Sequence, residues 1–108
     1  AQRCLAFHTI ENRDPDLPDS IKTSLGPWIA GCDICQDVCP WNHRDLPSSE
    51  DPDMQPRPWL LNVNAQDLQN WDDATWDQQL RGSALRRIKP WMWRRNAAAA
   101  QPDLPPNL

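Results

Sequence analysis

The sequence predicts a small α-rich domain of short helices, supported by a cysteine-bound group as well as by a modest apolar core. Three observations indicate this. The 108 residues suffice for one small domain but not for two. The chain has 12 prolines and is only 39% apolar, which argues against long helices and a large core. Finally, three of its four cysteines lie close together, at Cys32, Cys35 and Cys39.

The first regular element follows an apolar N-terminal stretch that ends at Asp14-Pro15. Residues 16–27, DLPDSIKTSLGP, predict one short helix, with Asp16 as a candidate N-cap and Gly26-Pro27 as its end. Ile21 and Leu25 are four positions apart and would face inward together. We therefore expect this helix to cover part of the core.

The cysteine-rich segment predicts a second helix, over residues 32–39. Its cysteines fall at positions i, i+3 and i+7, so on a helix they would share one face. Pro40 would end the element. Residues 43–58, rich in proline and acid, predict an extended loop without regular structure.

The second half of the chain predicts short helices with clear start and stop signals. Asn64 can cap a helix over 65–70, and Asp72 or Asp73 can cap one over 74–80 that Gly82 closes. Residues 83–100 predict two helical pieces interrupted at Pro90. Together, 59–100 form a helical C-terminal region, and 101–108 predict a disordered tail.

Charge is unevenly distributed along the chain, whose net charge is −4. Residues 1–42 carry six acids and three bases, residues 43–80 eight acids and two bases, and residues 81–108 one acid and six bases. The acidic total argues against general nucleic-acid binding, while the basic end allows a local phosphate-binding patch. Charge alone favours the simpler interpretation, a solvated helix face. No apolar run reaches membrane-spanning length.

The cysteine spacing, C-x27-C-x2-C-x3-C-P, allows three kinds of site. Disulfides would need an oxidising compartment, and three cysteines on one helix face suit two bridges poorly. Zinc suits four thiolates, but zinc ribbons usually offer paired C-x2-C knuckles. C-x2-C-x3-C-P is the last part of the bacterial ferredoxin run, whose final cysteine reaches the other of two clusters. The spacing thus favours iron–sulfur: Cys4, Cys32 and Cys35 on one cluster, and Cys39 on another.

Three stretches resemble the C-terminal part of the epoxyqueuosine reductase family: RCLAFHTIEN at 3–12, GCDICQDVCPWN at 31–42 and RGSALRRIKPWMWRRNAAAA at 81–100. The resemblance implies a ferredoxin-like domain with two [4Fe–4S] clusters, of which 1–42 is the C-terminal part. It also implies electron transfer from these clusters to a cobalamin. The family reduces the epoxide of epoxyqueuosine in tRNA to the alkene of queuosine, the last step of queuosine biosynthesis.

The resemblance also implies roles for individual residues. Cys4, Cys32 and Cys35 would share the second [4Fe–4S] cluster with an upstream cysteine, and Cys39 would close the first. Two further pairs of residues would lie near a cofactor and near the tRNA. Asp33 and Ile34 would run close to the cobalamin, and Arg86 and Arg87 would project together toward tRNA phosphates. With the family in view, the Arg- and Trp-bearing end favours tRNA contact over a solvated face.

Some features depart from the family or leave alternatives open. Phe7 and His8 stand where the family usually has a Tyr and an apolar residue. The chain begins without a Met and lacks the corrinoid domain and catalytic acid, so we expect a fragment that is inactive alone. We expect a cytoplasmic monomer without membrane contact, and no particular electron donor is indicated. The alternatives are a ferredoxin-like electron-transfer module of another corrinoid reductase, of the reductive dehalogenase kind, and a zinc-stabilised interaction module.

Overall fold

The structure is a computed structural model that describes residues 1–101 and residue 103, and every regular element in that part is helical. The α-rich prediction is therefore confirmed. The disordered tail predicted over 101–108 lies almost wholly outside the described residues. The α-helices are α1 (Asp19–Lys22), α2 (Ile34–Asp37), α3 (Ala65–Gln69), α4 (Asp73–Leu80) and α5 (Pro90–Ala99). A π-helical turn and four 3-10 turns join them: η1 (Phe7–Glu11), η2 (Pro40–His43), η3 (Pro52–Met54), η4 (Pro58–Leu61) and η5 (Ala84–Arg87).

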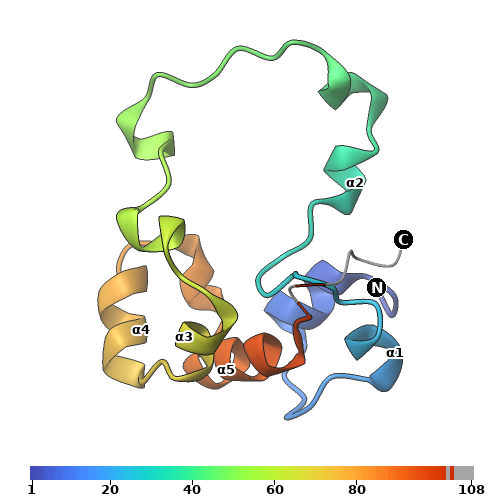
Figure 1. Cartoon of the computed structure of the whole chain (residues 1–108), viewed down its shortest axis with the longest axis vertical. Helices are drawn as coiled ribbons and strands as arrows, with labels where there is room; N and C mark the ends of the chain where they lie inside the picture. Colours follow the sequence, from blue (N-terminus) through green and yellow to red (C-terminus); the bar gives the residue numbers. More distant parts are fainter. Residues whose placement is uncertain (102, 104–108) are drawn as a thin grey trace.

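Two apolar cores contact α5, the larger along most of the helix and the smaller at its C-terminal end. The C-terminal core is formed by α3, α4, the end of η5 and α5, and its buried members are Leu68, Trp71, Leu80, Ile88, Met92, Trp93 and Ala97. The N-terminal core is smaller, with Leu5, Leu17, Ile21 and Leu25 buried. Ala99 and Ala100 at the end of α5 pack against it. As Figure 1 shows, α5 spans from the α3–α4 side of the molecule to the N-terminal side.

Side-chain caps determine where the C-terminal helices begin. Asn64 accepts from the backbone N–H of Asp67, and the Asp67 carboxylate accepts from that of Asn64, which completes a capping box before α3. Asp72 accepts from the N–H of Thr75 at the start of α4. Both caps were predicted. Gly82, with φ of +72°, turns the chain out of α4, as also predicted.

The predicted cap of α1 is wrong. Pro18 occupies the N-cap position, and Asp16 lies two residues farther upstream. The Asp16 carboxylate instead accepts from the N–H of Leu17 and pairs with Lys22 at 2.6 Å. Pro18 displaces the cap because its ring fixes the backbone geometry that leads into the helix. Ile21 and Leu25 are buried together, as predicted.

The helix predicted over 32–39 is also shorter than expected. Only Ile34–Asp37 is α-helical, because Gly31 enters the segment at φ of +81° and Cys39 takes the extended geometry required before Pro40. Pro40 then begins η2. The three clustered cysteines therefore do not share one helix face: Cys32 precedes α2, Cys35 lies within it, and Cys39 follows it.

Between η2 and η4 the chain leaves the body of the molecule. Residues 44–57, which we call the arch, loop outward from the cysteine segment before returning toward α3 (Figure 1). Apart from the short turn η3, the arch has no helix, and residues 40–56 are all exposed. Among the described residues, no helix has the length and apolar character that a membrane span requires.

Candidate metal centre

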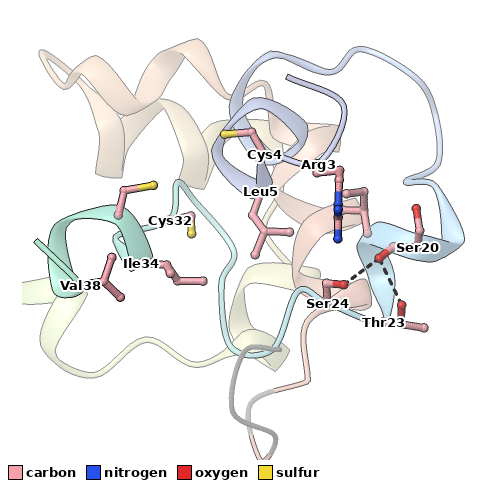
Figure 2. Close-up of a pocket in the computed structure, with 11 residues that line it drawn as sticks. Arg3, Cys4, Leu5, Ser20, Thr23, Ser24, Cys32, Ile34 and Val38 are labelled. Atoms are coloured by element: carbon pink, nitrogen blue, oxygen red, sulfur yellow. Dashed lines mark hydrogen bonds between the residues drawn. The ribbon is translucent and has the colours of Figure 1, made fainter. Parts of the chain in front are cut away.

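An open pocket of about 1070 Å³ lies between the N-terminal segment, α1 and α2. Its lining is Arg3, Cys4, Leu5, Ser20, Ile21, Thr23, Ser24, Cys32, Ile34, Cys35 and Val38. Three of the four cysteines are thus brought to one pocket from segments that are far apart in sequence. Figure 2 shows Cys4 on the N-terminal segment and Cys32 on the segment that leads into α2. Leu5 and Ile34 project between these two segments.

The three pocket cysteines differ in their surroundings. Cys4 and Cys35 are exposed, whereas Cys32 is half-buried and packs against the N-terminal core. All four thiols are free, so the structure contains no disulfide among them. Leu5, Ile34 and Val38 supply an apolar wall beside the sulfurs, and such a wall limits the access of water to a bound group.

Local backbone bonds hold the segment that carries Cys4. The carbonyl of Cys4 accepts from the N–H of His8, and the N–H of Cys4 donates to the carbonyl of Ala1. His8 is buried; its Nε2 donates to the Gln2 carbonyl at 2.8 Å, and its Nδ1 accepts from the Asn12 amide at 3.1 Å. This side chain therefore links the N-terminal residues to η1.

The thiolates that line the pocket are suitable donors for an iron–sulfur cluster. In the described part of the chain, no group of three or more Cys, His, Asp or Glu side chains converges closely enough to hold one metal ion. A structural zinc needs four ligands on one atom. Three soft thiolates on one apolar-walled pocket suit an iron–sulfur cluster.

Cys39 is placed apart from the other three. It lies after α2 in extended backbone, half-buried, and does not line the pocket. The division of the cysteines into a group of three and a single one is the division that the sequence predicts. The assignment of Cys39 to a different cluster remains a prediction.

Asp33 and Ile34 lie at the start of α2. Asp33 is exposed at the N-cap position, and its side chain makes no capping hydrogen bond. Ile34 lines the pocket and packs against the N-terminal core. Ile34 therefore has a packing role of its own, and the predicted proximity of both residues to cobalamin stays a prediction.

Arg86 and Arg87 do not project together, so that part of the prediction is wrong. They lie on a 3-10 turn, where successive side chains point a third of a turn apart. Arg86 pairs with Asp77 at 2.8 Å and lies 4.4 Å over the Trp76 ring, on the α4 side. Arg87 turns to η1 and forms a bidentate pair with Glu11, in which Nη2 and Oε2 are 2.9 Å apart.

These ion pairs affect the carboxylates that take part in them. The hydrogen bond from Arg87 holds the pKa of Glu11 below its ordinary value of 4.5. Hydrogen bonds from Arg81 and then Arg86 likewise lower the pKa of Asp77. Both predicted tRNA-contacting arginines thus already carry a carboxylate partner within the chain.

Both the cysteine segment and the whole chain are similar to known proteins. Residues 1–42 match the family model described as a 4Fe-4S double cluster binding domain. The full chain is 75% identical to an epoxyqueuosine reductase of Synechococcus sp. (strain CC9605), of which it spans 34%. Over 92% of the chain it is 52% identical to the Synechocystis enzyme of that name, spanning 34% of it. Over 97% of the chain, it is 40% identical to the epoxyqueuosine reductase of Vibrio cholerae, and it spans 28% of that protein.

The chain therefore spans about a third of the length of the curated relatives that it matches. No solved structure matches it significantly.

Proposed function

We propose that this chain is the iron–sulfur portion of an epoxyqueuosine reductase. The whole chain is similar to about a third of the length of such an enzyme. One observation carries the proposal: Cys4, Cys32 and Cys35 line the same pocket. The match of residues 1–42 to a double-cluster domain supports this interpretation of the pocket.

The chain's own residues would hold and shield the clusters. Cys4, Cys32 and Cys35 would bind one [4Fe–4S] cluster together with a cysteine from elsewhere in the longer protein. Cys39 would complete the other, and Pro40, which has no N–H, turns the backbone away behind it. The apolar wall of the pocket would exclude water and so help to set the reduction potential.

When bound, the clusters supply single electrons, which in this proposal go to a cobalamin and serve the reduction of epoxyqueuosine to queuosine in tRNA. No residue of this chain is assigned to the epoxide itself. The resemblance to the family implies that Asp33 and Ile34, between the pocket cysteines Cys32 and Cys35, would lie toward the cobalamin. In this proposal, reductase activity, cytoplasmic location and a monomeric state would be properties of the whole enzyme.

A second candidate is an electron-transfer module of another corrinoid reductase. The pocket would serve it equally well, since the thiolates are the same. The names of the relatives favour the first candidate. The basic C-terminal segment favours it less strongly, because four of its arginines, Arg81, Arg86, Arg87 and Arg94, are already paired with carboxylates.

The cluster assignment can be tested on the full-length protein, purified without oxygen. We expect about eight irons per chain, as two [4Fe–4S] clusters require, with matching sulfide. Cys32→Ser and Cys35→Ser should each remove one cluster and leave the other. Ser24→Ala, on the same pocket but without a ligand atom, should keep both. Zinc in place of iron in the wild-type protein would reject the proposal.

Contact with tRNA needs its own test, in the same full-length protein. If Arg87 reaches a phosphate, Arg87→Ala should weaken tRNA binding and lower the slope of log affinity against log salt by about 1. Glu11→Gln frees the guanidinium from its carboxylate and should strengthen binding. Unchanged affinity in both variants would assign Arg87 to the ion pair alone.

A further inference from the structure

The two segments that carry the pocket cysteines meet at Thr9. One segment runs from Cys4 through η1, and the other from Ile29 to Cys35. Thr9 is fully buried; its hydroxyl donates to the Leu5 carbonyl at 2.9 Å and accepts from the N–H of Gly31 at 3.0 Å. Gly31 directly precedes Cys32. The relative position of the two segments therefore depends on how well this contact is held.

Asn96 of α5 bridges the same two segments. Its side chain is fully buried, and its Nδ2 donates to the carbonyl of Thr9 at 2.8 Å and to that of Ile29 at 2.9 Å. Both hydrogens of one amide are thus used, one on each cysteine-bearing segment. A buried amide with both donors satisfied in this way fixes the separation of the two carbonyls.

Arg95 fixes the orientation of that amide. Its guanidinium donates to Asn96 Oδ1 from Nε at 3.0 Å and from Nη2 at 2.9 Å, so the oxygen of Asn96 faces Arg95 and the nitrogen faces the two carbonyls. The same guanidinium donates to the carbonyls of His8, Asn12 and Asp14. Arg95 therefore also holds the N-terminal segment on which Cys4 lies.

We propose that Arg95 and Asn96, which we call the α5 clamp, are positioning residues that set the spacing of Cys4 relative to Cys32 and Cys35. The inference rests on the proposed function, since it assigns the spacing to a cluster. The α5 clamp lies outside residues 1–42, the part of the chain that matches the cluster-binding family. The C-terminal helices would then contribute to cluster retention without supplying any ligand.

The neighbouring residue offers a matched control. Arg94 on the same helix donates to the Trp71 carbonyl at 2.8 Å and to Asp73 at 3.3 Å, both in the C-terminal half. Arg94→Ala removes a comparable set of bonds without touching either cysteine segment. Asn96→Asp keeps the size of the side chain but replaces the donor with an oxygen that faces two carbonyls. Asn96→Ala removes the bridge altogether.

The first experiment measures cluster retention in the full-length protein, isolated without oxygen. Iron release to a chelator should be about 10- to 100-fold faster in Asn96→Ala and Asn96→Asp, the range typical of lost outer-shell contacts. Only one of the two clusters, identified by comparison with the spectrum of Cys32→Ser, should show this change. Arg94→Ala should release iron at the wild-type rate. Equal loss in Arg94→Ala and Asn96→Ala, or loss of both clusters together, would overturn the proposal.

A second measurement keeps the inference testable without iron. The amide hydrogen of Gly31 should exchange faster in Asn96→Ala than in the wild-type protein, with no such change in Arg94→Ala. Unchanged Gly31 exchange in Asn96→Ala would show that the clamp does not hold the segments. A wild-type protein that binds no iron, by contrast, would reject the proposed function and the role in cluster spacing, while Gly31 exchange would still report on the clamp itself.

Discussion

The N-terminal and C-terminal regions are stabilised in different ways. Residues 1–42 enclose a core of four buried aliphatic side chains and have buried polar groups such as His8, Thr9 and Asn12. Residues 58–100 enclose seven buried apolar side chains, among them Trp71 and Trp93. The second region buries more apolar side chains, whereas the first region depends more on hydrogen bonds, on α5 and, as we propose, on bound clusters.

Tryptophan contributes most of this difference. Trp59, Trp71 and Trp93 form a tilted stack, with ring centroids 5.2 and 5.6 Å apart along the series. The indole N–H of Trp76 donates to the carbonyl of Ile88, which ties α4 to the end of η5. Large rings thus replace the many small aliphatic side chains that this proline-rich sequence lacks.

The largest expected difference between the regions appears on removal of metal. Stripping iron from the full-length protein should lower amide-exchange protection in residues 1–42 without abolishing it, since the proposed clusters would contribute directly to folding there. Residues 65–99 should keep most of their protection because their core contains no cysteine. Hydrogen exchange with and without a chelator measures both. Equal loss in the two regions would contradict the comparison.

Truncating the tryptophan stack should have the next largest effect, and in the other region. Trp93→Ala should lower the free energy of unfolding by about 3–5 kcal/mol, as expected for a large buried aromatic side chain. Trp41→Ala is a matched control, because Trp41 is 66% exposed. Denaturant unfolding followed by circular dichroism gives both values. A similar cost for the two variants would show that the stack adds little stability.

The caps give a smaller effect, confined to one helix. Asn64→Ala removes half of the capping box before α3 and should cost about 1 kcal/mol. Asn64→Ser, which keeps a side-chain acceptor, should restore most of it. The same denaturant titration measures the two variants. Thermal unfolding of the cysteine region should be unchanged in both.

The smallest effect concerns the ion pair between the regions, Glu11 with Arg87. Because the pKa of Glu11 is lowered in the folded protein, its contribution is present above the ordinary pKa and is lost as pH falls through the folded value. Glu11→Gln should therefore lower the melting temperature slightly at pH 7, and by progressively less as pH falls below 4.5. Glu50→Gln, on the exposed arch, should show no such difference. A pH-independent effect of Glu11→Gln would contradict the ion pair.

Much of the C-terminal region could be predicted from sequence because its signals are local. Asn64 and Asp72 act within four residues of their own positions, and Gly82 turns the chain where it stands. The grouping of Cys4, Cys32 and Cys35 was predicted from the similarity of C-x2-C-x3-C-P to the ferredoxin run, and these three cysteines line one pocket. The length of the helix around Cys35 could not be predicted from the cysteine spacing, because Gly31 before it and Pro40 after it shorten the helix.

Long-range polar contacts had no sequence signal. Arg87 and Glu11 are 76 positions apart, and nothing near either residue specifies the other. Asn96 stands before a run of alanines that suggests close helix packing, and Ala97 is indeed buried. The partners of Asn96, however, are backbone carbonyls, which every residue possesses. Only the folded arrangement shows which carbonyls it reaches.

The arch has a consequence for how the molecule is connected. Its two ends emerge from regions that already hold each other through α5, η1 and the pair of Arg87 with Glu11, so the peptide backbone is not the sole link between them. A protease cut within residues 45–51, exposed and without helix, would leave two fragments still associated in one particle. The same two pieces, expressed as separate polypeptides, should reassemble by complementation.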